Sequence, residues 1–148
     1  MAQDVPISEI AGCTCLRLRK AARCATQIYD RCLEPTGLTI TQFGLLAHLF
    51  LRAGISIGEL AEALVMDPTT LTRNLRPLER RGHVRIKASK NDRRRREVVL
   101  TAGGRAVFEA AAPLWREAQT RVAAALGADE AMQLNRALDH SIVRLVTV

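Results

Sequence analysis

The hydrophobic and polar positions of the chain recur mostly at the spacing of α-helices, with one short stretch of strand-like alternation. Residues 83–87 alternate polar and apolar side chains, and residues 98–100 form a second apolar run, so the two segments predict a β-hairpin with a polar loop. Residues 1–10 carry only a weak pattern. Helices are predicted over residues 12–33, 41–52, 56–64, 67–81, 102–126 and 129–146. The expected fold class is mainly α with a small β-hairpin.

Local signals mark where several of these helices begin. Thr41 is a candidate N-cap for the second helix, and Ser56 followed by Glu59 is a candidate capping box for the third. Asp67 precedes Pro68, which fits an N-cap with proline at the first helical position. Thr101 is positioned to cap the long helix that follows the hairpin.

The overall composition describes a small globular protein with a polyanionic partner. The 148 residues are 48% hydrophobic and 3% aromatic, which is enough for one packed domain over residues 1–148. No run approaches the ~20 apolar residues of a membrane helix, and the first ten residues lack the apolar segment of a secretion signal. We therefore expect a cytoplasmic protein that binds no membrane. The net charge of +7 favours nucleic acid as the partner.

The positive charge is concentrated in one segment rather than spread over the chain. Between Arg73 and Arg96 there are eleven Lys or Arg residues and only two acids, Glu79 and Asp92. The remaining residues carry slightly more acids than bases. A basic run is often only a solvated face, so its position relative to the predicted elements decides its meaning.

The order of elements around this segment is a helix, a short helix, a turn, a helix and a basic hairpin, which suits the reading of duplex DNA. Leu71, Leu75 and Leu78 recur at i, i+4 and i+7 and should hold the helix over residues 67–81 against the core. A helix fits the DNA major groove, where threonine and arginine contact phosphates and base edges. The residues expected to face outward and contact DNA are Thr69, Thr70, Thr72, Arg73 and Arg76.

The hairpin supplies a second candidate DNA contact. Arginine side chains gain from the concentrated negative potential of a narrow minor groove. An acid within such a run can orient a neighbouring arginine by a charge-assisted hydrogen bond. The candidate residues are Asp92, Arg93, Arg94 and Arg95, although their alternation along the hairpin prevents all of them from facing one groove.

These segments resemble the MarR family of bacterial winged helix-turn-helix transcription regulators. The resemblance covers nearly the whole chain and is carried by four segments, the last of which leads into Leu100–Thr101: Ser56–Ala61, Thr69–Arg73, Leu78–Val84 and Asp92–Arg94. Arg95 and Arg96 depart from the family pattern, which commonly has apolar or small residues there.

The resemblance implies a homodimer formed by the N- and C-terminal helices, over about residues 10–34 and 102–148, with a winged helix-turn-helix over about residues 40–101. It further implies one recognition helix in each of two major grooves and wing arginines in the flanking minor grooves. The implied function is a transcription regulator of the repressor type, which binds an inverted-repeat operator and is released by a small-molecule effector. A small aromatic or phenolic ligand between the dimer helices and the DNA-binding lobe is typical of the family.

The apolar residues outside the DNA-reading unit independently favour a dimer. An ~80-residue lobe offers too little surface to bury them, so a partner chain is expected to cover them. The alternative is that these helices pack only on their own lobe. The residues concerned are Trp115, Val122, Leu126, Leu134, Leu138, Ile142, Leu145 and Val146.

The cysteines suggest a second function as a sensor. Cys13 and Cys15 lie where the first long helix is predicted to begin, and Arg17 and Arg19 add positive charge that favours a reactive thiolate. Such thiols react with oxidants or bind a thiophilic metal or metalloid, although a three-thiolate site would need the second subunit. Some family relatives sense hydroperoxides with a cysteine near this position, but they rely on several tyrosines around it, whereas this chain has only Tyr29. Cys24 and Cys32 are more simply explained as small buried hydrophobes.

Other classes of function have little support. The three histidines are scattered, no glycine-rich phosphate loop is present, and no serine or acid lies in the context of a catalytic nucleophile. We therefore predict that the protein is not an enzyme and needs no cofactor. A protein-interaction module that uses the same scaffold without DNA is a weaker alternative.

Overall fold

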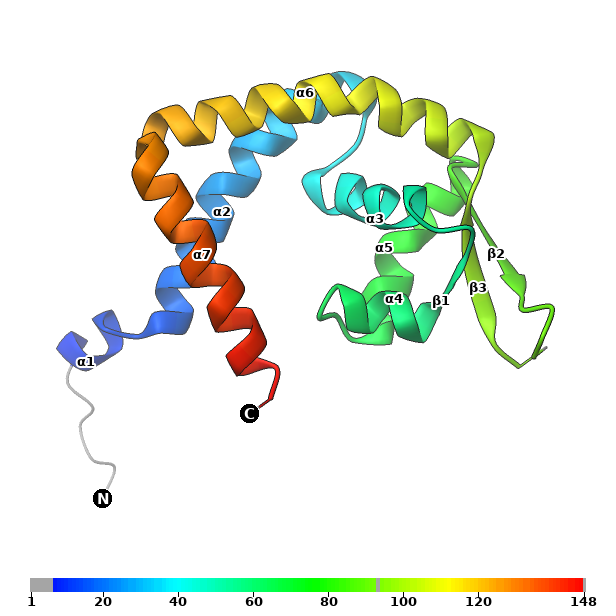
Figure 1. The fold of residues 1–148 in the computed structure, drawn as a ribbon, viewed down its shortest axis with the longest axis horizontal. Coiled ribbons are helices and arrows are strands. Elements are labelled where there is room, and N and C mark those ends of the chain that lie inside the picture. Colours follow the sequence, from blue (N-terminus) through cyan, green and yellow to red (C-terminus); the bar gives the residue numbers. More distant parts are fainter. Residues whose placement is uncertain (1–6, 93, 148) are drawn as a thin grey trace.

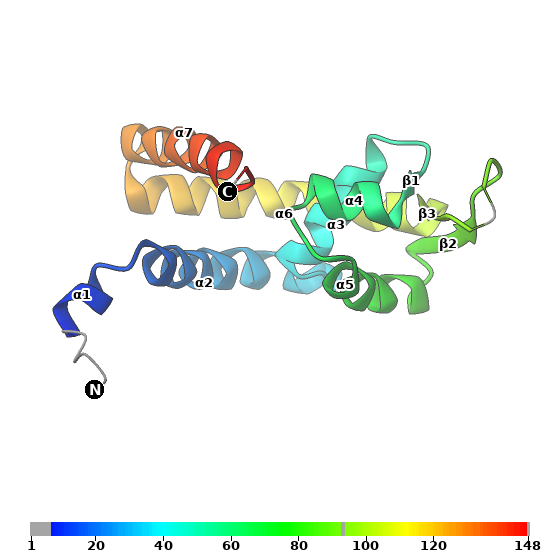
Figure 2. The ribbon, with the colours of Figure 1, turned by 90° about the horizontal axis from the view of Figure 1, so that it is seen from below.

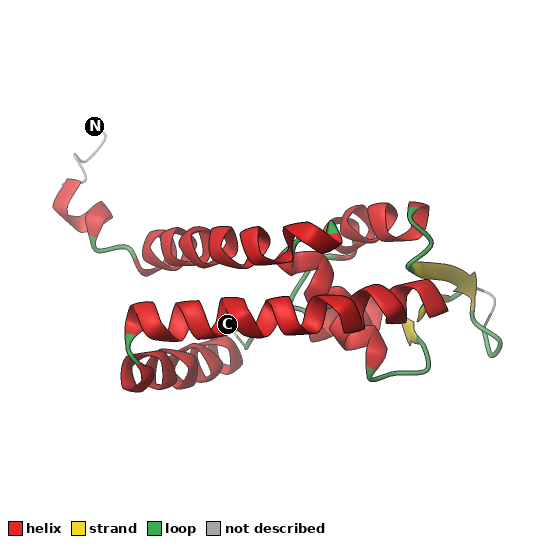
Figure 3. Ribbon diagram, turned by 90° about the horizontal axis from the view of Figure 1, so that it is seen from above, coloured by secondary structure: helices red, strands yellow, loops and turns green. Residues whose placement is uncertain are grey.

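The computed structural model describes residues 7–92 and 94–147, which form a compact lobe and an extended group of long helices (Figures 1 and 3). The lobe contains η1 (Glu34–Thr36), α3 (Ile40–Phe50), β1 (Ile55–Ser56), α4 (Ile57–Ala63), α5 (Pro68–Arg80), β2 (Val84–Ala88) and β3 (Arg96–Leu100). The long helices are α2 (Thr14–Leu33), α6 (Ala102–Leu126) and α7 (Ala128–Leu145), preceded by the short α1 (Ile7–Ala11). Across these residues, every helix is too short or too polar to cross a bilayer.

The mainly helical fold with one small sheet is confirmed, and α6 has the predicted bounds. The N-cap of α3, however, is Thr39, so the prediction of Thr41 was wrong. The Thr39 side chain accepts a hydrogen bond from the Gln42 amide at 3.2 Å, and the Gln42 side chain accepts one from the Thr39 amide at 3.2 Å. This reciprocal pair satisfies two backbone donors that the start of a helix leaves unpaired, whereas Thr41 is already inside the first turn.

The sheet is larger than the sequence pattern indicated. Its strand order is β1-β3-β2, with both pairs antiparallel. The hairpin pairs Ala88 with Arg96, so β3 begins two residues before the predicted apolar run. Of the two residues of β1, Ser56 was predicted as a helix cap and Ile55 was assigned to no element, because a strand so short shows no periodicity of its own. The N-terminal segment also contains the five-residue α1, where no regular element was expected.

Four of the five aromatic residues join the lobe to the long helices. The Phe43 ring in α3 stacks on Phe108 and Trp115 of α6, at centroid distances of 5.0 and 5.7 Å, and Phe50 contacts Phe108 at 4.8 Å. The Arg105 guanidinium lies 4.3 Å from the centre of the Phe50 ring. Trp115 therefore packs within its own chain, and its inclusion among the residues that need a partner was wrong.

A tight joint connects the end of α5, the start of β2 and the first turn of α6. The backbone of Gly82 has a φ of +73°, which glycine adopts without strain and which ends α5. The hydroxyl of Thr101 donates to the carbonyl oxygen of Gly82 at 2.5 Å, and its amide donates to the carbonyl oxygen of His83 at 3.1 Å. A β-carbon on Gly104 would lie 1.9 Å from that same oxygen, so only glycine fits this contact. The joint fixes α6 against the half of the lobe that contains α5 and the β2–β3 hairpin.

Replacing Thr39 with Ala is expected to lower the free energy of unfolding by about 1 kcal/mol, the usual value of an N-cap side chain. Thr41→Ala should have a much smaller effect, because the Thr41 side chain caps nothing and alanine favours helix. Urea denaturation of both variants at equal protein concentration measures the difference. Equal destabilisation by the two substitutions would contradict the assignment of Thr39 as the cap.

The stability of the protein is expected to fall as the pH drops below about 6.5, because of His83. Burial, with a contribution from nearby Arg81, lowers the pKa of His83 from its usual value of 6.5. The Nδ1 atom of His83 is buried and lacks a hydrogen-bond partner among the described residues. The unfolded chain therefore binds a proton at a higher pH than the folded chain, so acid favours unfolding from about pH 6.5 downward until His83 also titrates in the folded state.

Denaturant melts of the wild type and of His83→Gln at pH 7 and pH 5.5 test this expectation. The wild type should lose more of its unfolding free energy between the two pH values than the variant does. Parallel losses in both proteins would assign the pH dependence to other groups.

Candidate nucleic-acid interface

The central element of the site is α5, whose position is fixed by three leucines. Leu71, Leu75 and Leu78 are fully buried, as the i, i+4, i+7 spacing predicted. The helix begins at Asp67, whose carboxylate accepts hydrogen bonds from the amide and the hydroxyl of Thr70, with the amide at 2.8 Å. These hydrogen bonds lower the pKa of Asp67 and keep its side chain ionised at the positive end of the helix.

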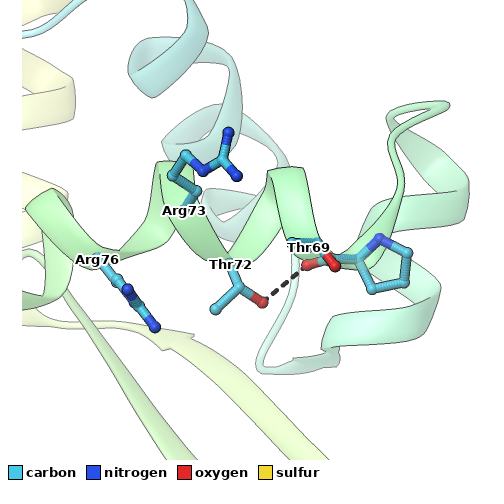
Figure 4. Close-up of a pocket in the computed structure, with 5 residues that line it drawn as sticks. Thr69, Thr72, Arg73 and Arg76 are labelled. Carbon is cyan, nitrogen blue, oxygen red and sulfur yellow. Dashed lines mark hydrogen bonds between the residues drawn. The ribbon is translucent and has the colours of Figure 1, made fainter.

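The outward face of α5 presents threonine and arginine side chains. Thr69, Arg73 and Arg76 are exposed, whereas Thr70 and Thr72 are half-buried. The Thr70 hydroxyl donates to Asp67, and the Thr72 hydroxyl donates to the Pro68 carbonyl at 2.8 Å (Figure 4). In the same view Arg73 and Arg76 extend in different directions from the helix. Together with Pro68, Thr69 and Thr72, they line a surface hollow of about 330 Å³.

The hairpin between β2 and β3 presents further arginines. Its loop is held by backbone bonds: the Ser89 amide donates to the Arg95 carbonyl at 2.8 Å, and the Arg95 amide donates to the Asp92 carbonyl at 2.9 Å. Arg94 and Arg95 are exposed. Arg93, another predicted DNA contact, lies outside the described residues.

The acid within the hairpin has a role in shaping the loop. The Asp92 carboxylate accepts a hydrogen bond from the backbone amide of Arg94 at 2.9 Å, the geometry of an Asx turn. The expectation was that Asp92 orients an arginine side chain. In the structure, Asp92 orients the backbone of Arg94 and not an arginine side chain.

Two wing arginines lie beside the first helix of the helix-turn-helix. Arg95 and Arg96 line a shallow hollow of about 270 Å³ together with Ser56, Ile57 and Gly58 at the start of α4. Hydrogen bonds from Ser56, and to a smaller extent the positive charge of Arg95, lower the pKa of Glu59 in the capping box. Arg96 was noted in the sequence only as a departure from the family pattern, yet it borders the same hollow as Arg95.

Not every cation of the basic segment belongs to this face. The Arg81 side chain donates to the carbonyl of Gly37 at 2.6 Å, which ties the end of α5 to the turn before α3. A β-carbon on Gly37 would lie 2.6 Å from the Arg81 guanidinium. Arg81 adds to the positive charge of the basic segment, but its side chain is held in a contact within the lobe and not directed to the outward face of α5.

The long helices leave an apolar groove open in the single chain. The groove has a volume of about 590 Å³, and residues of α2, α6 and α7 line it, including Cys24, Tyr29 and Leu134. The Tyr29 hydroxyl donates to Gln119 at its edge, which links α2 to α6. Large apolar side chains beside the groove and along the same helices are also exposed: Leu16, Leu18, Leu126, Met132, Ile142, Val143, Leu145 and Val146.

The cysteines fall into three environments. Cys13 is the half-buried N-cap residue of α2, and Cys15 is exposed in the first turn of that helix. Cys32 is buried as predicted. Cys24 is exposed in the single chain, so the prediction that Cys24 is buried was wrong for the single chain. All four cysteines are free thiols, and the described residues contain no cluster of three or more His, Cys, Asp or Glu side chains arranged to hold a metal ion.

The sequence of this chain is similar to those of known transcription regulators. A sequence model of the MarR family matches residues 36–95. The HTH-type transcriptional repressor Rv2887 of Mycobacterium tuberculosis is 36% identical over 107 residues, which is 72% of this chain and 77% of the relative. The transcriptional activatory protein BadR of Rhodopseudomonas palustris is 35% identical over 104 residues, but the match spans only 59% of BadR and 68% of this chain.

Solved structures agree over a larger part of the chain. The M. tuberculosis transcriptional regulator MosR in complex with DNA is 41% identical, with a TM-score of 0.72 and coverage of 87% of this chain and 98% of MosR. The transcriptional repressor CouR bound to a 23-mer DNA duplex is 26% identical, with a TM-score of 0.75 and coverage of 99% of this chain and 100% of CouR. The similarity thus includes the long helices as well as the lobe.

The resemblance first indicated by the wing and the capping box is confirmed by these relatives and by the winged lobe of the structure. Relatives at 36% and 41% identity, of which the chain covers 77% and 98%, are transcription regulators. The chain therefore belongs to the MarR family of winged helix-turn-helix transcription regulators, which are DNA-binding proteins rather than enzymes.

Proposed function

We propose that this protein is a homodimeric repressor that reads an inverted-repeat operator with α5 in the major groove and the hairpin in the flanking minor groove. One observation carries the proposal: Thr69, Arg73 and Arg76 of α5 and Arg94 of the wing are all exposed on one lobe, with the joint at Gly82 between them. Arginine pairs with guanine in the major groove and gains from the negative potential of the minor groove.

The open groove among α2, α6 and α7 supports the dimer. Leu126, Met132 and Leu134 are 38%, 48% and 43% exposed in the single chain. Large apolar surface of this extent, next to an apolar groove of about 590 Å³, is covered in soluble proteins by a partner. A second copy related by two-fold symmetry presents the same surface in return, and such a dimer places two α5 helices on two half-sites of opposite orientation.

An apolar hollow between a long helix and the lobe supports control by a small-molecule effector. Leu64 and Val65, in the turn before α5, face Ile142, Leu145 and Val146 near the end of α7 across a space of about 340 Å³. This volume lies in the range of small-ligand pockets. A small aromatic or phenolic molecule there would contact both the helix-turn-helix turn and a dimer helix, so its binding would change the position of α5.

The proposal predicts different outcomes for substitutions in the wing and in α5. Arg94→Ala should weaken binding to all duplexes, because each wing loses a positive charge close to the phosphates. The negative slope of log K against log salt concentration should become shallower by about one for each wing. Arg73→Ala should cost roughly 1–3 kcal/mol on the operator and relax the base preference. Fluorescence anisotropy with a promoter duplex, at several salt concentrations, measures both effects and gives the stoichiometry of two chains per duplex.

Arg116→Ala is the matched control, since Arg116 is exposed on α6 outside the lobe. An Arg94 variant that binds like the wild type would show that the wing assignment is wrong. One chain per duplex would contradict the dimer.

A second candidate function is a thiol switch at Cys13 and Cys15, which a specific arrangement favours. Cys13 has an extended backbone, with φ of −60° and ψ of 118°, and Cys15 is exposed just inside α2. The Arg17 side chain donates to the Gly12 carbonyl at 2.9 Å, so a cation lies close to this turn. A peroxide would oxidise the two thiols to one disulfide and be reduced to water, and closing that bond would distort the first turn of α2.

A DNA-shift assay with two arms separates the two candidate modes of release. In one arm hydrogen peroxide is added, and in the other salicylate, to the wild type and to the double variant Cys13→Ser, Cys15→Ser. A thiol switch predicts that peroxide releases DNA from the wild type but not from the double variant. An effector of the phenolic class predicts release by salicylate from both proteins. Release of the double variant by peroxide would eliminate these thiols as the switch.

A further inference from the structure

Two acids, Glu79 and Asp92, interrupt the basic segment, and the carboxylate of each accepts a hydrogen bond from a backbone amide. Asp92 accepts from the Arg94 amide inside the wing loop at 2.9 Å. Glu79, in the last turn of α5, accepts from the amide of Ile86 in β2 at 3.3 Å. The first contact lies within the hairpin, but the second connects the recognition helix to the hairpin.

The contact of Glu79 lies at the open edge of the sheet. Because the strand order is β1-β3-β2, one side of β2 has no neighbouring strand in the part of the chain that the structure describes. Alternate amides of an edge strand point away from the sheet, and the Ile86 amide is one that finds its acceptor in Glu79 instead of in β3. The carboxylate therefore ties β2 to α5 about midway along the strand, beyond the joint at Gly82 and His83.

The position of Glu79 is unfavourable for DNA binding on charge alone. It lines a surface hollow of about 560 Å³ together with Arg73, Arg76 and Arg80. A negative charge among these cations reduces the attraction of the face for phosphate. Simple electrostatics thus predicts that removal of Glu79 strengthens DNA binding.

We propose that Glu79 is a positioning residue that sets the wing relative to the recognition helix, an inference that rests on the proposed function. Its carboxylate holds β2 at a fixed distance from the last turn of α5, so that Arg94 reaches the minor groove while Arg73 reaches the major groove. Without this acceptor the base of the hairpin is still held, by the hydrogen bond from the His83 amide to the Leu78 carbonyl and by burial of Val84 and Val98 in the core. The outer edge of β2 loses its side-chain contact with α5, and Arg94 is no longer placed for the groove.

Two substitutions at this position separate the hydrogen bond from the charge. Glu79→Gln removes the charge but keeps a side-chain oxygen that accepts from the Ile86 amide, whereas Glu79→Ala removes both. Glu62→Ala is the matched control, because Glu62 is an exposed acid of the same lobe whose side chain makes no hydrogen bond within residues 7–92 and 94–147. Circular dichroism melts report whether each variant is folded.

The probe is a duplex of about 30 base pairs selected from a random pool by the wild-type protein, which is long enough for two half-sites and their flanks. Affinity is measured by anisotropy, and the regions contacted are mapped by hydroxyl-radical footprinting. Arg94→Ala is also combined with Glu79→Ala in a double-mutant cycle.

We expect Glu79→Ala to bind the duplex about three- to tenfold more weakly, the effect of one hydrogen bond, despite its higher positive charge. Its footprint should lose the minor-groove flanks and keep the major-groove centre, and Arg94→Ala should cost less in this background than in the wild type. Glu79→Gln and Glu62→Ala should bind at least as tightly as the wild type, with complete footprints.

Tighter binding by Glu79→Ala with intact flanks would overturn the positioning role and leave the proposed function standing. Equal weakening by the Gln and Ala variants would also overturn it, because the acceptor would then be irrelevant. If the wild type selects no duplex from the pool, both this inference and the proposed function fail.

Discussion

The structure depends on the burial of one apolar stripe, formed by Leu71, Leu75 and Leu78 of α5. These side chains are fully buried against the core of the lobe, and their burial decides which way the rest of the helix faces. A helix has no preferred rotation about its own axis until one face is removed from water. Because the leucines fix that rotation, Thr69, Arg73 and Arg76 are exposed, and the helix can present them to a groove.

The wing takes its position from α5 rather than from the core alone. The chain leaves α5 through Gly82, crosses the joint at His83 and enters β2, whose outer edge returns to Glu79. The hairpin is therefore held at its base by the joint and along its edge by the helix. Its far end is shaped by Asp92, so the two acids of the basic segment act on the backbone that carries the arginines.

The long helix α6 transmits the position of the lobe to the rest of the molecule. Its first turn packs against His83 so closely that only glycine fits at position 104, and its middle carries Phe108 and Trp115 onto α3. From there it continues across α2 and ends where α7 turns away from it, as Figures 1 and 2 together show. If the proposed function holds, an effector or a thiol reaction among the long helices would act on the lobe through α6.

The sequence by itself determined the longer helices, the β2–β3 hairpin and the face of α5, but not the short α1 and β1. The period of the leucines, the Asp67–Pro68 start and the Thr101 cap are local signals, and each depends on bonds within a few residues, so the pattern alone located them. It also identified the basic hairpin, because charge density needs no fold to be counted. The family followed from the same short segments.

Only the tertiary structure decided which of these side chains contact other parts of the chain and which remain exposed. Trp115 packs on Phe43 of its own chain. The Thr39 cap of α3, by contrast, is a local signal that the sequence pattern misplaced at Thr41. Arg81 reaches Gly37, and Glu79 reaches the edge of β2. Contacts such as those of Trp115 and Arg81 join residues far apart in the sequence, and a one-dimensional pattern carries no information about the distance between such groups. Hydrophobic period is a property of neighbours along the chain, whereas the partner of a long side chain is set by which elements the completed core brings together.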